Sequence, residues 1–134
     1  MVEKLNNIEL ICKRAKDASY KLANSSNKER NTALKLIANQ ILKSIDKIII
    51  ANKKDYIAAK KNKVPSSLLD RLLLNEERIK SIAKDVLNIS KLEDPIGKEL
   101  IKKLRPNGLK ITKVSVPLGV IAVIFESRPN VACD

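Results

Sequence analysis

Apolar residues recur every three or four positions through the first ninety residues of the chain, which is the spacing of one helix face. The first such face contains Ile8, Ile11, Cys12, Ala15, Ala18, Ser19 and Leu22. Later faces contain Ala33, Leu34, Ile37, Ala38, Ile41, Leu42 and Ile45, then Ile48, Ile49, Asn52, Tyr56 and Ala59, and finally Ile79, Ile82, Ala83, Val86 and Leu87. These patterns predict amphipathic helices whose apolar faces, including Cys12, seek a shared core.

Polar residues and proline mark the expected helix boundaries. Ser26 with Glu29 three positions later resembles a capping box for the second helix, and Asp46 is placed to cap the third. Pro65 interrupts the helical pattern, which resumes as a short helix through the leucines that follow. Asn75 is then placed to cap a longer helix with acidic residues in its first turn.

The apolar period changes to two after Gly97. Residues 100–104 and 110–116 alternate as strands do, and the turn formers of Arg105–Gly108 separate them. This arrangement predicts a β-hairpin.

Six consecutive apolar residues, Val120 to Phe125, follow Pro117 and Gly119. A strand that is apolar on both faces is typical of a parallel sheet covered by helices on each side. Ligands of open α/β folds bind outside the carboxyl ends of such strands, where Glu126–Asn130 would lie. A surface loop after a core strand explains the same pattern equally well.

The composition of the chain bears on whether it binds nucleic acid. The net charge is +12, with 27 Lys and Arg against 15 Asp and Glu, which raises the question of nucleic-acid binding. The lysines are spread over every segment, however, and only two Tyr and one Phe are present to stack on bases. We therefore expect no nucleic-acid partner.

Cysteine and histidine usage excludes several site types. The chain has no His, and Cys12 and Cys133 lie far apart without a CxxC spacing, so we expect no metal site and no His-based triad. Two scattered cysteines fit a reducing compartment. Because the chain shows neither a signal-peptide pattern nor an apolar run of about 20 residues, we expect a cytoplasmic protein.

Four motifs together resemble one enzyme family. They are the segment PLGVIAVIFESRPNV (117–131), Arg105–Leu109, Leu68–Ile79 and Ala51–Asp55. Their order and spacing are similar to those of the γ-glutamyl phosphate reductases, which belong to the aldehyde dehydrogenase superfamily. The resemblance covers residues 50 to 134, and the preceding helical stretch fits it as well. It implies an α/β fragment with a helical amino-terminal region (1–96). Over 97–134 it implies the hairpin, the first strand (Gly119–Phe125) and the following loop of a truncated NADP-binding, Rossmann-like domain.

The resemblance also implies a reaction. The family reduces γ-glutamyl phosphate to glutamate 5-semialdehyde with NADPH in proline biosynthesis, through a cysteine thiolate that forms a thioester. The implied cofactor-binding residues are Ser127, Arg128, Pro129 and Asn130. Asn130 is the candidate amide for the oxyanion, with Ser127 as the alternative, and Arg128 suits a phosphate or carboxylate. An ion pair with Glu126 or with another loop residue is the other interpretation of Arg128.

The family's nucleophilic cysteine lies downstream of residue 134. Cys12 is expected to be a structural thiol, and Cys133 stands where the family has a small apolar residue. The resemblance therefore implies a truncated reductase, about three times shorter than the enzyme and inactive alone. Two alternatives remain: a helical protein-interaction module, and one half of a split reductase completed by a separately encoded carboxyl-terminal partner. An interaction module would have no use for the loop Glu126–Asn130, so its presence favours the reductase.

Overall fold

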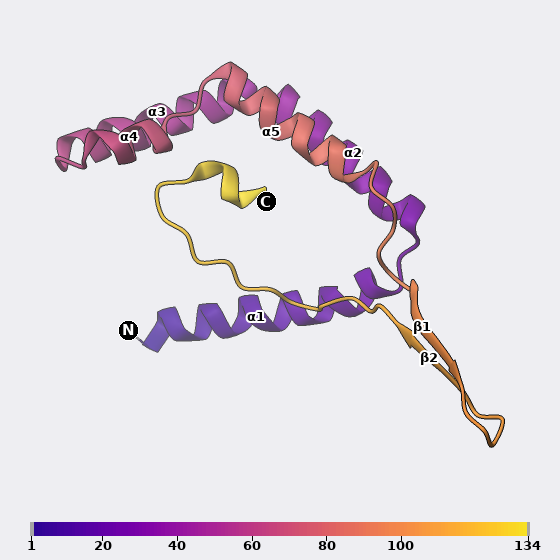
Figure 1. The fold of residues 1–134 in the computed structure, drawn as a ribbon. Helices are drawn as coiled ribbons and strands as arrows, with labels where there is room; N and C mark the ends of the chain where they lie inside the picture. Colours follow the sequence, from indigo (N-terminus) through magenta and orange to yellow (C-terminus); the bar gives the residue numbers. More distant parts are fainter. Residues whose placement is uncertain (1, 134) are drawn as a thin grey trace. The chain divides into compact units, whose positions relative to one another are not determined.

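The computed structural model describes residues 2–133, with side chains described from residue 7 onward. These residues form two compact units, one of Met1–Asn27 with Glu93–Ala122 and the other of Lys28–Leu92 with Val123–Asp134. The elements in chain order are the helices α1 (Val2–Ala23), α2 (Asn27–Lys43), α3 (Ile45–Lys61), α4 (Ser66–Leu72) and α5 (Glu76–Ile89), the strands β1 (Glu99–Leu104) and β2 (Lys110–Val114), and the 3₁₀ turn η1 (Pro129–Ala132) (Figure 1). The described chain is thus mostly helical, with one two-stranded antiparallel hairpin. The division into domains at residue 96 stays a prediction.

One predicted helix cap is confirmed and one is wrong. The side chain of Asn75 accepts a hydrogen bond of 2.8 Å from the backbone N–H of Arg78, which confirms it as the cap of α5. The predicted cap at Asp46 is wrong. Helix α3 begins at Ile45, and the N–H of Ile48 donates to the carbonyl oxygen of Ser44 at 2.9 Å, so Ser44 holds the cap position. Asp46 falls inside the first turn because α2 ends only two residues before α3 begins.

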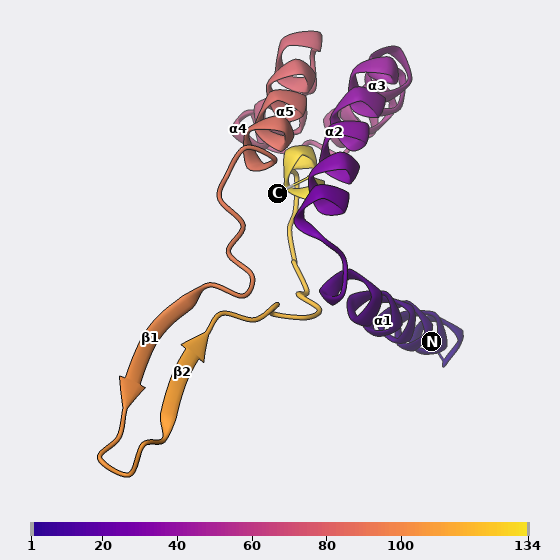
Figure 2. The same cartoon turned by 90° about the vertical axis from the view of Figure 1, so that its right-hand side faces the viewer.

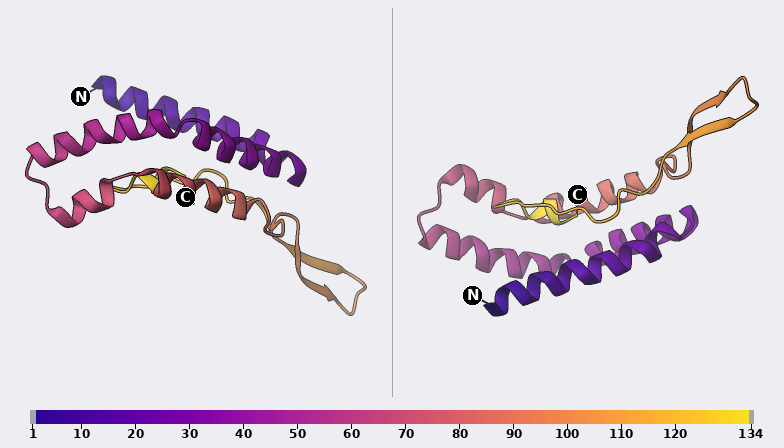
Figure 3. Two further views of the ribbon diagram at one scale, coloured as in Figure 1. Left: turned by 90° about the horizontal axis from the view of Figure 1, so that it is seen from above. Right: turned by 90° about the horizontal axis from the view of Figure 1, so that it is seen from below.

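The core of the second unit lies between α2 and α5. Ala38, Ala83 and Val86 are buried there, and Leu34, Ile41 and Leu87 pack against them. Ile79 is also buried, at 1% exposure. Figure 3 shows α5 running alongside α2 and α4 alongside α3. The apolar stripes predicted for α2 and α5 therefore do supply the core, although Ile37 and Leu42 of the α2 stripe remain exposed.

The hairpin in the first unit follows its predicted turn. The N–H of Gly108 donates to the carbonyl oxygen of Arg105, and the N–H of Arg105 donates to the carbonyl oxygen of Leu109, both at 2.9 Å. Gly108 has φ +83°, as a three-residue hairpin loop that ends in a left-handed residue requires. Beyond this turn Leu104 pairs with Lys110 and Lys102 with Thr112 (Figure 2).

The predicted strand Gly119–Phe125 is not formed. Residues 115–125 have no strand assignment, and Ile124 is 99% exposed. A strand needs neighbours for its backbone hydrogen bonds, and the only strands in the described part of the chain are the two of the hairpin. The parallel Rossmann-like sheet is therefore absent from residues 2–133.

The apolar face of α1 is another correction. Ile8 and Ile11 were predicted to seek the core, yet both are more than half exposed, and Cys12 is exposed as well. Within its unit α1 meets the chain near Gly119 and Val120, where an apolar groove forms. This contact reaches only the carboxyl-terminal half of the helix, so the rest of the face stays uncovered.

Candidate functional site

An open pocket of about 470 Å³ lies within the second unit, against α4, α5 and η1. It is lined by Asp70, Arg71, Leu73, Leu74, Arg78, Ser81, Ile82, Asp85, Val86, Ile89, Arg128, Pro129, Asn130 and Cys133. The lining contains both apolar and charged side chains, and the volume of the pocket falls in the range of small-molecule sites. Three of the four residues that sequence analysis singled out meet here with the helices.

The predicted loop residues divide into two groups. Arg128, Pro129 and Asn130 line the pocket, whereas Ser127 does not. Ser127 instead has φ +52°, in the left-handed region that only glycine enters without strain. Strained backbone at non-glycine positions concentrates at functional sites, which is the reason to keep Ser127 among the candidates.

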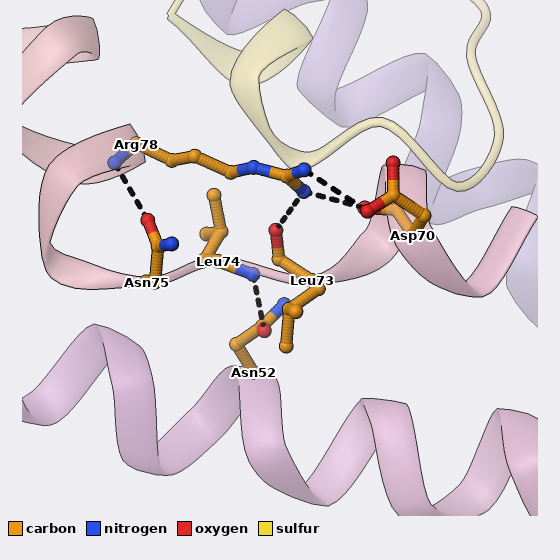
Figure 4. Close-up of polar contacts among 6 residues, drawn as sticks. All are labelled: Asn52, Asp70, Leu73, Leu74, Asn75 and Arg78. Carbon is orange, nitrogen blue, oxygen red and sulfur yellow. Dashed lines mark hydrogen bonds and ion pairs between the residues drawn. The ribbon is translucent and has the colours of Figure 1, made fainter.

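The wall formed by α4 and α5 is held by Arg78. Its guanidinium donates to the carbonyl oxygen of Leu73 at 2.8 Å, to the carbonyl oxygen of Asp70, and to the Asp70 carboxylate at 3.1 Å (Figure 4). The planar guanidinium carries several donors in fixed directions, so one side chain ties the end of α4 to the start of α5. Arg78 therefore shapes the pocket with donors that are already engaged.

Asn52 anchors the same wall from below. Its Nδ2 donates to the carbonyl oxygen of Leu72 at 2.7 Å. Its Oδ1 accepts from the N–H of Leu74 at 2.8 Å (Figure 4). Asn52 is 6% exposed. Sequence analysis placed it on the apolar face of its helix without assigning it a role, although a polar residue at such a position is itself a signal of a buried hydrogen bond.

Three charged side chains of the pocket have no partner among the described residues. Arg71, Asp85 and Arg128 make neither an ion pair nor a side-chain hydrogen bond with another described residue. The alternative interpretation of Arg128, an ion pair with Glu126, is therefore not observed. Sequence analysis missed Arg71 and Asp85 as site residues. Arg71 lies within a motif that carried the family resemblance, so that motif was the available signal.

Cys133 also lies on the pocket wall. Its N–H donates to the carbonyl oxygen of Asn130 at 2.8 Å, which closes η1, and its thiol is not in a disulfide. Cys12 belongs to α1, in the other unit. Neither thiol is joined by His, and no described residues gather the His, Cys, Asp or Glu groups that a metal ion needs.

The hydropathy of the helices bears on whether any of them could span a membrane. Across residues 2–133, none of the helices combines the length and the apolar character that crossing a lipid bilayer takes.

Comparisons with known proteins show which enzymes this chain is similar to. None of the protein-family models matches this chain. Individual relatives do: the γ-glutamyl phosphate reductase of Dictyoglomus thermophilum is 44% identical over all 134 residues, and that of Photobacterium profundum is 44% identical over 128 residues, 96% of the chain. The crystal structure of the Thermotoga maritima reductase matches 90% of the chain with a TM-score of 0.86 and 38% identity, and the matched part is 29% of that protein. The chain spans 31% of the length of each of the first two relatives. This chain is therefore a homologue of γ-glutamyl phosphate reductase, corresponding to about a third of the full-length enzyme.

Proposed function

We propose that this chain provides the amino-terminal part of a γ-glutamyl phosphate reductase, the enzyme that reduces γ-glutamyl phosphate to glutamate 5-semialdehyde and releases phosphate. The observation that carries the proposal is the match to the Dictyoglomus thermophilum reductase, which runs over all 134 residues without losing the loop 126–130. A remnant kept only for its helices would be free to lose that loop.

The pocket residues suit a role beside the reacting groups. Arg128 and Asn130 bring a guanidinium and an amide to one pocket, and both are donors to anionic or carbonyl oxygens. These donors suit the anionic reacting end of the substrate, and the nicotinamide dinucleotide that the family uses would lie beside it and supply the hydride. Asn130 would then stabilise negative charge on the substrate oxygen as the carbonyl carbon is attacked. Its place in the pocket favours Asn130 over Ser127 for this role.

The thiol nucleophile is not among these residues in our proposal. Cys12 belongs to the other unit. The resemblance puts Cys133 where the family usually has a small apolar residue. The nucleophile would come from the two-thirds of the family's length that the 134 residues do not cover. We therefore expect the 134 residues to catalyse no reduction by themselves, and to do so when the remaining part is supplied, in the same chain or as a separate one.

A chimera tests this proposal. The matching 31% of the Dictyoglomus thermophilum enzyme is replaced by this chain, and NADPH formation is followed with glutamate 5-semialdehyde, phosphate and NADP⁺. The enzyme with that part deleted is the control, and the 134-residue chain is assayed alone and after mixing with the deleted enzyme. We expect turnover from the chimera and none from either part alone. A folded chimera without turnover would overturn the proposal.

The second candidate is the helical interaction module. The observation in its favour is the exposed apolar face of α1, with Ile8 and Ile11 more than half exposed. A folded, inactive chimera would leave this function as the better account of the chain.

A further inference from the structure

We propose that the pocket of α4, α5 and η1 binds the glutamyl part of the substrate, a step that rests on the proposed function. Asp85 would hold the α-ammonium group, Arg71 the α-carboxylate, and Arg128 the anionic γ-end that reacts. All three side chains line this one pocket.

The count of unpaired charges carries the proposal. The lining contains three arginines and two aspartates, and Arg78 with Asp70 forms an ion pair at 3.1 Å. This leaves two cations, Arg71 and Arg128, and one anion, Asp85, without partners among the described residues. A glutamyl group with an anionic γ-end has the complementary set, two anionic groups and one ammonium. Arginine binds carboxylate and phosphate oxygens through parallel hydrogen bonds, which suits both anionic ends.

The positions of Arg71, Asp85 and Arg128 in the chain indicate which end of the substrate each would bind. Arg128 is two residues from Asn130, the proposed oxyanion donor, so the reacting end of the substrate belongs at Arg128. Arg71 and Asp85 come from α4 and α5, and an amino acid needs both charges close together at its α-carbon. Ile82 and Val86 of the lining offer apolar surface to the methylene groups between the two ends.

The ions are exposed, so each contact is screened by water and the affinity should be modest and salt-dependent. The informative measurement is therefore how affinity differs between ligands that carry different charged groups. Removing one charge from the protein should weaken only those ligands that carry the matching charge.

The test titrates the 134-residue chain with three small ligands and follows backbone amide shifts by NMR. L-Glutamate has all three charges, glutarate lacks the ammonium group, and 4-aminobutyrate lacks the α-carboxylate. We expect saturable shifts for residues 81–86 and 128–133 with L-glutamate. Asp85→Asn should weaken L-glutamate about tenfold and leave glutarate unchanged, whereas Arg71→Gln should weaken L-glutamate about tenfold and leave 4-aminobutyrate unchanged.

Matched controls are Lys84→Gln, next to Asp85 but outside the pocket lining, and Arg105→Gln in the hairpin turn; neither should change any affinity. Equal weakening of all ligands by Asp85→Asn, or no saturable shift at these amides, would overturn the inference. The chimera separates the two proposals. Turnover with an unchanged KM in Asp85→Asn would overturn this inference alone, whereas selective binding without turnover would overturn the proposed function alone.

Discussion

The side-chain oxygen of Asn52 accepts a hydrogen bond of 2.8 Å from the backbone N–H of Leu74, 22 positions later in the chain. The same amide donates to the carbonyl oxygen of Leu72 at 2.7 Å. The segment between α4 and α5 has few backbone hydrogen-bond partners. The side chain of Asn52 supplies one donor and one acceptor to it. Because Leu73 and Leu74 line the pocket, this contact links the interior of α3 to the candidate site.

Replacing Asn52 by Leu should therefore destabilise the second unit. The change leaves one backbone donor and one acceptor without partners in a partly buried place, which costs about 2 kcal/mol. Urea unfolding followed by circular dichroism at 222 nm measures the loss. Asn39→Leu, at an exposed position of α2, is the matched control and should change stability little. Equal losses of stability in the two variants would show that the hydrogen bonds of Asn52 do not stabilise the unit.

The ion pair of Arg78 and Asp70 should matter less than the backbone contacts of Arg78. Asp70→Asn removes the charge from an exposed pair and should cost about 0.5 kcal/mol or less. Arg78→Gln also removes the donors to the carbonyl oxygens of Leu73 and Asp70, and should cost about 1–2 kcal/mol. The same unfolding measurement ranks the two variants, and a larger loss for Asp70→Asn would contradict this explanation.

The hairpin depends on the left-handed conformation of Gly108, with φ +83°. Gly108→Ala should destabilise the hairpin by about 1 kcal/mol, because a Cβ disfavours this conformation. Gly108→Asn should cost less, since Asn tolerates it better. Faster amide exchange at β1 and β2 is the expected readout. An unchanged exchange rate in Gly108→Ala would mean that the turn does not set the pairing.

Acid should destabilise α5 by protonating Glu76 and so removing its ion pair with Lys80. Lys80 lies 2.6 Å from the Glu76 carboxylate and, by hydrogen bond and charge, lowers the pKa of Glu76 below its ordinary value. A carboxyl group whose pKa is lower in the folded than in the unfolded state stabilises the fold at pH values above its unfolded-state pKa. This stabilisation is lost as the pH falls through the folded-state pKa. Glu76→Gln should therefore lower stability at neutral pH and flatten its acid dependence.

The control for that experiment is Glu77→Gln, in the same first turn, which makes no ion pair with a described residue. Stability curves against pH that fall in parallel for Glu76→Gln and the parent chain would contradict the assigned contact.

Local patterns predicted the helices and the hairpin well, because those elements satisfy their hydrogen bonds nearby in the chain. Asn75 and Gly108 are examples, since each acts within three residues of itself. The segment Gly119–Phe125 shows the limit. Its apolar run indicates burial, but a strand is defined by distant neighbours that no short window contains. Sequence analysis predicted the pocket at Arg128, Pro129 and Asn130, and the motif Leu68–Ile79 was a signal for Arg71 that it did not use. Asp85 lies in none of the quoted motifs and joins the pocket through tertiary packing.

The most direct test of the account is the role of Asn130 in the active chimera. Asn130→Ala should lower kcat about 100-fold with little change in KM, because one hydrogen-bond donor to the developing oxyanion is lost. Asn107→Ala, in the hairpin turn and outside the pocket, is the control and should retain the parent kcat. An unchanged kcat in Asn130→Ala, or an equal loss in Asn107→Ala, would contradict the claim that the loop 126–130 works at the reaction centre.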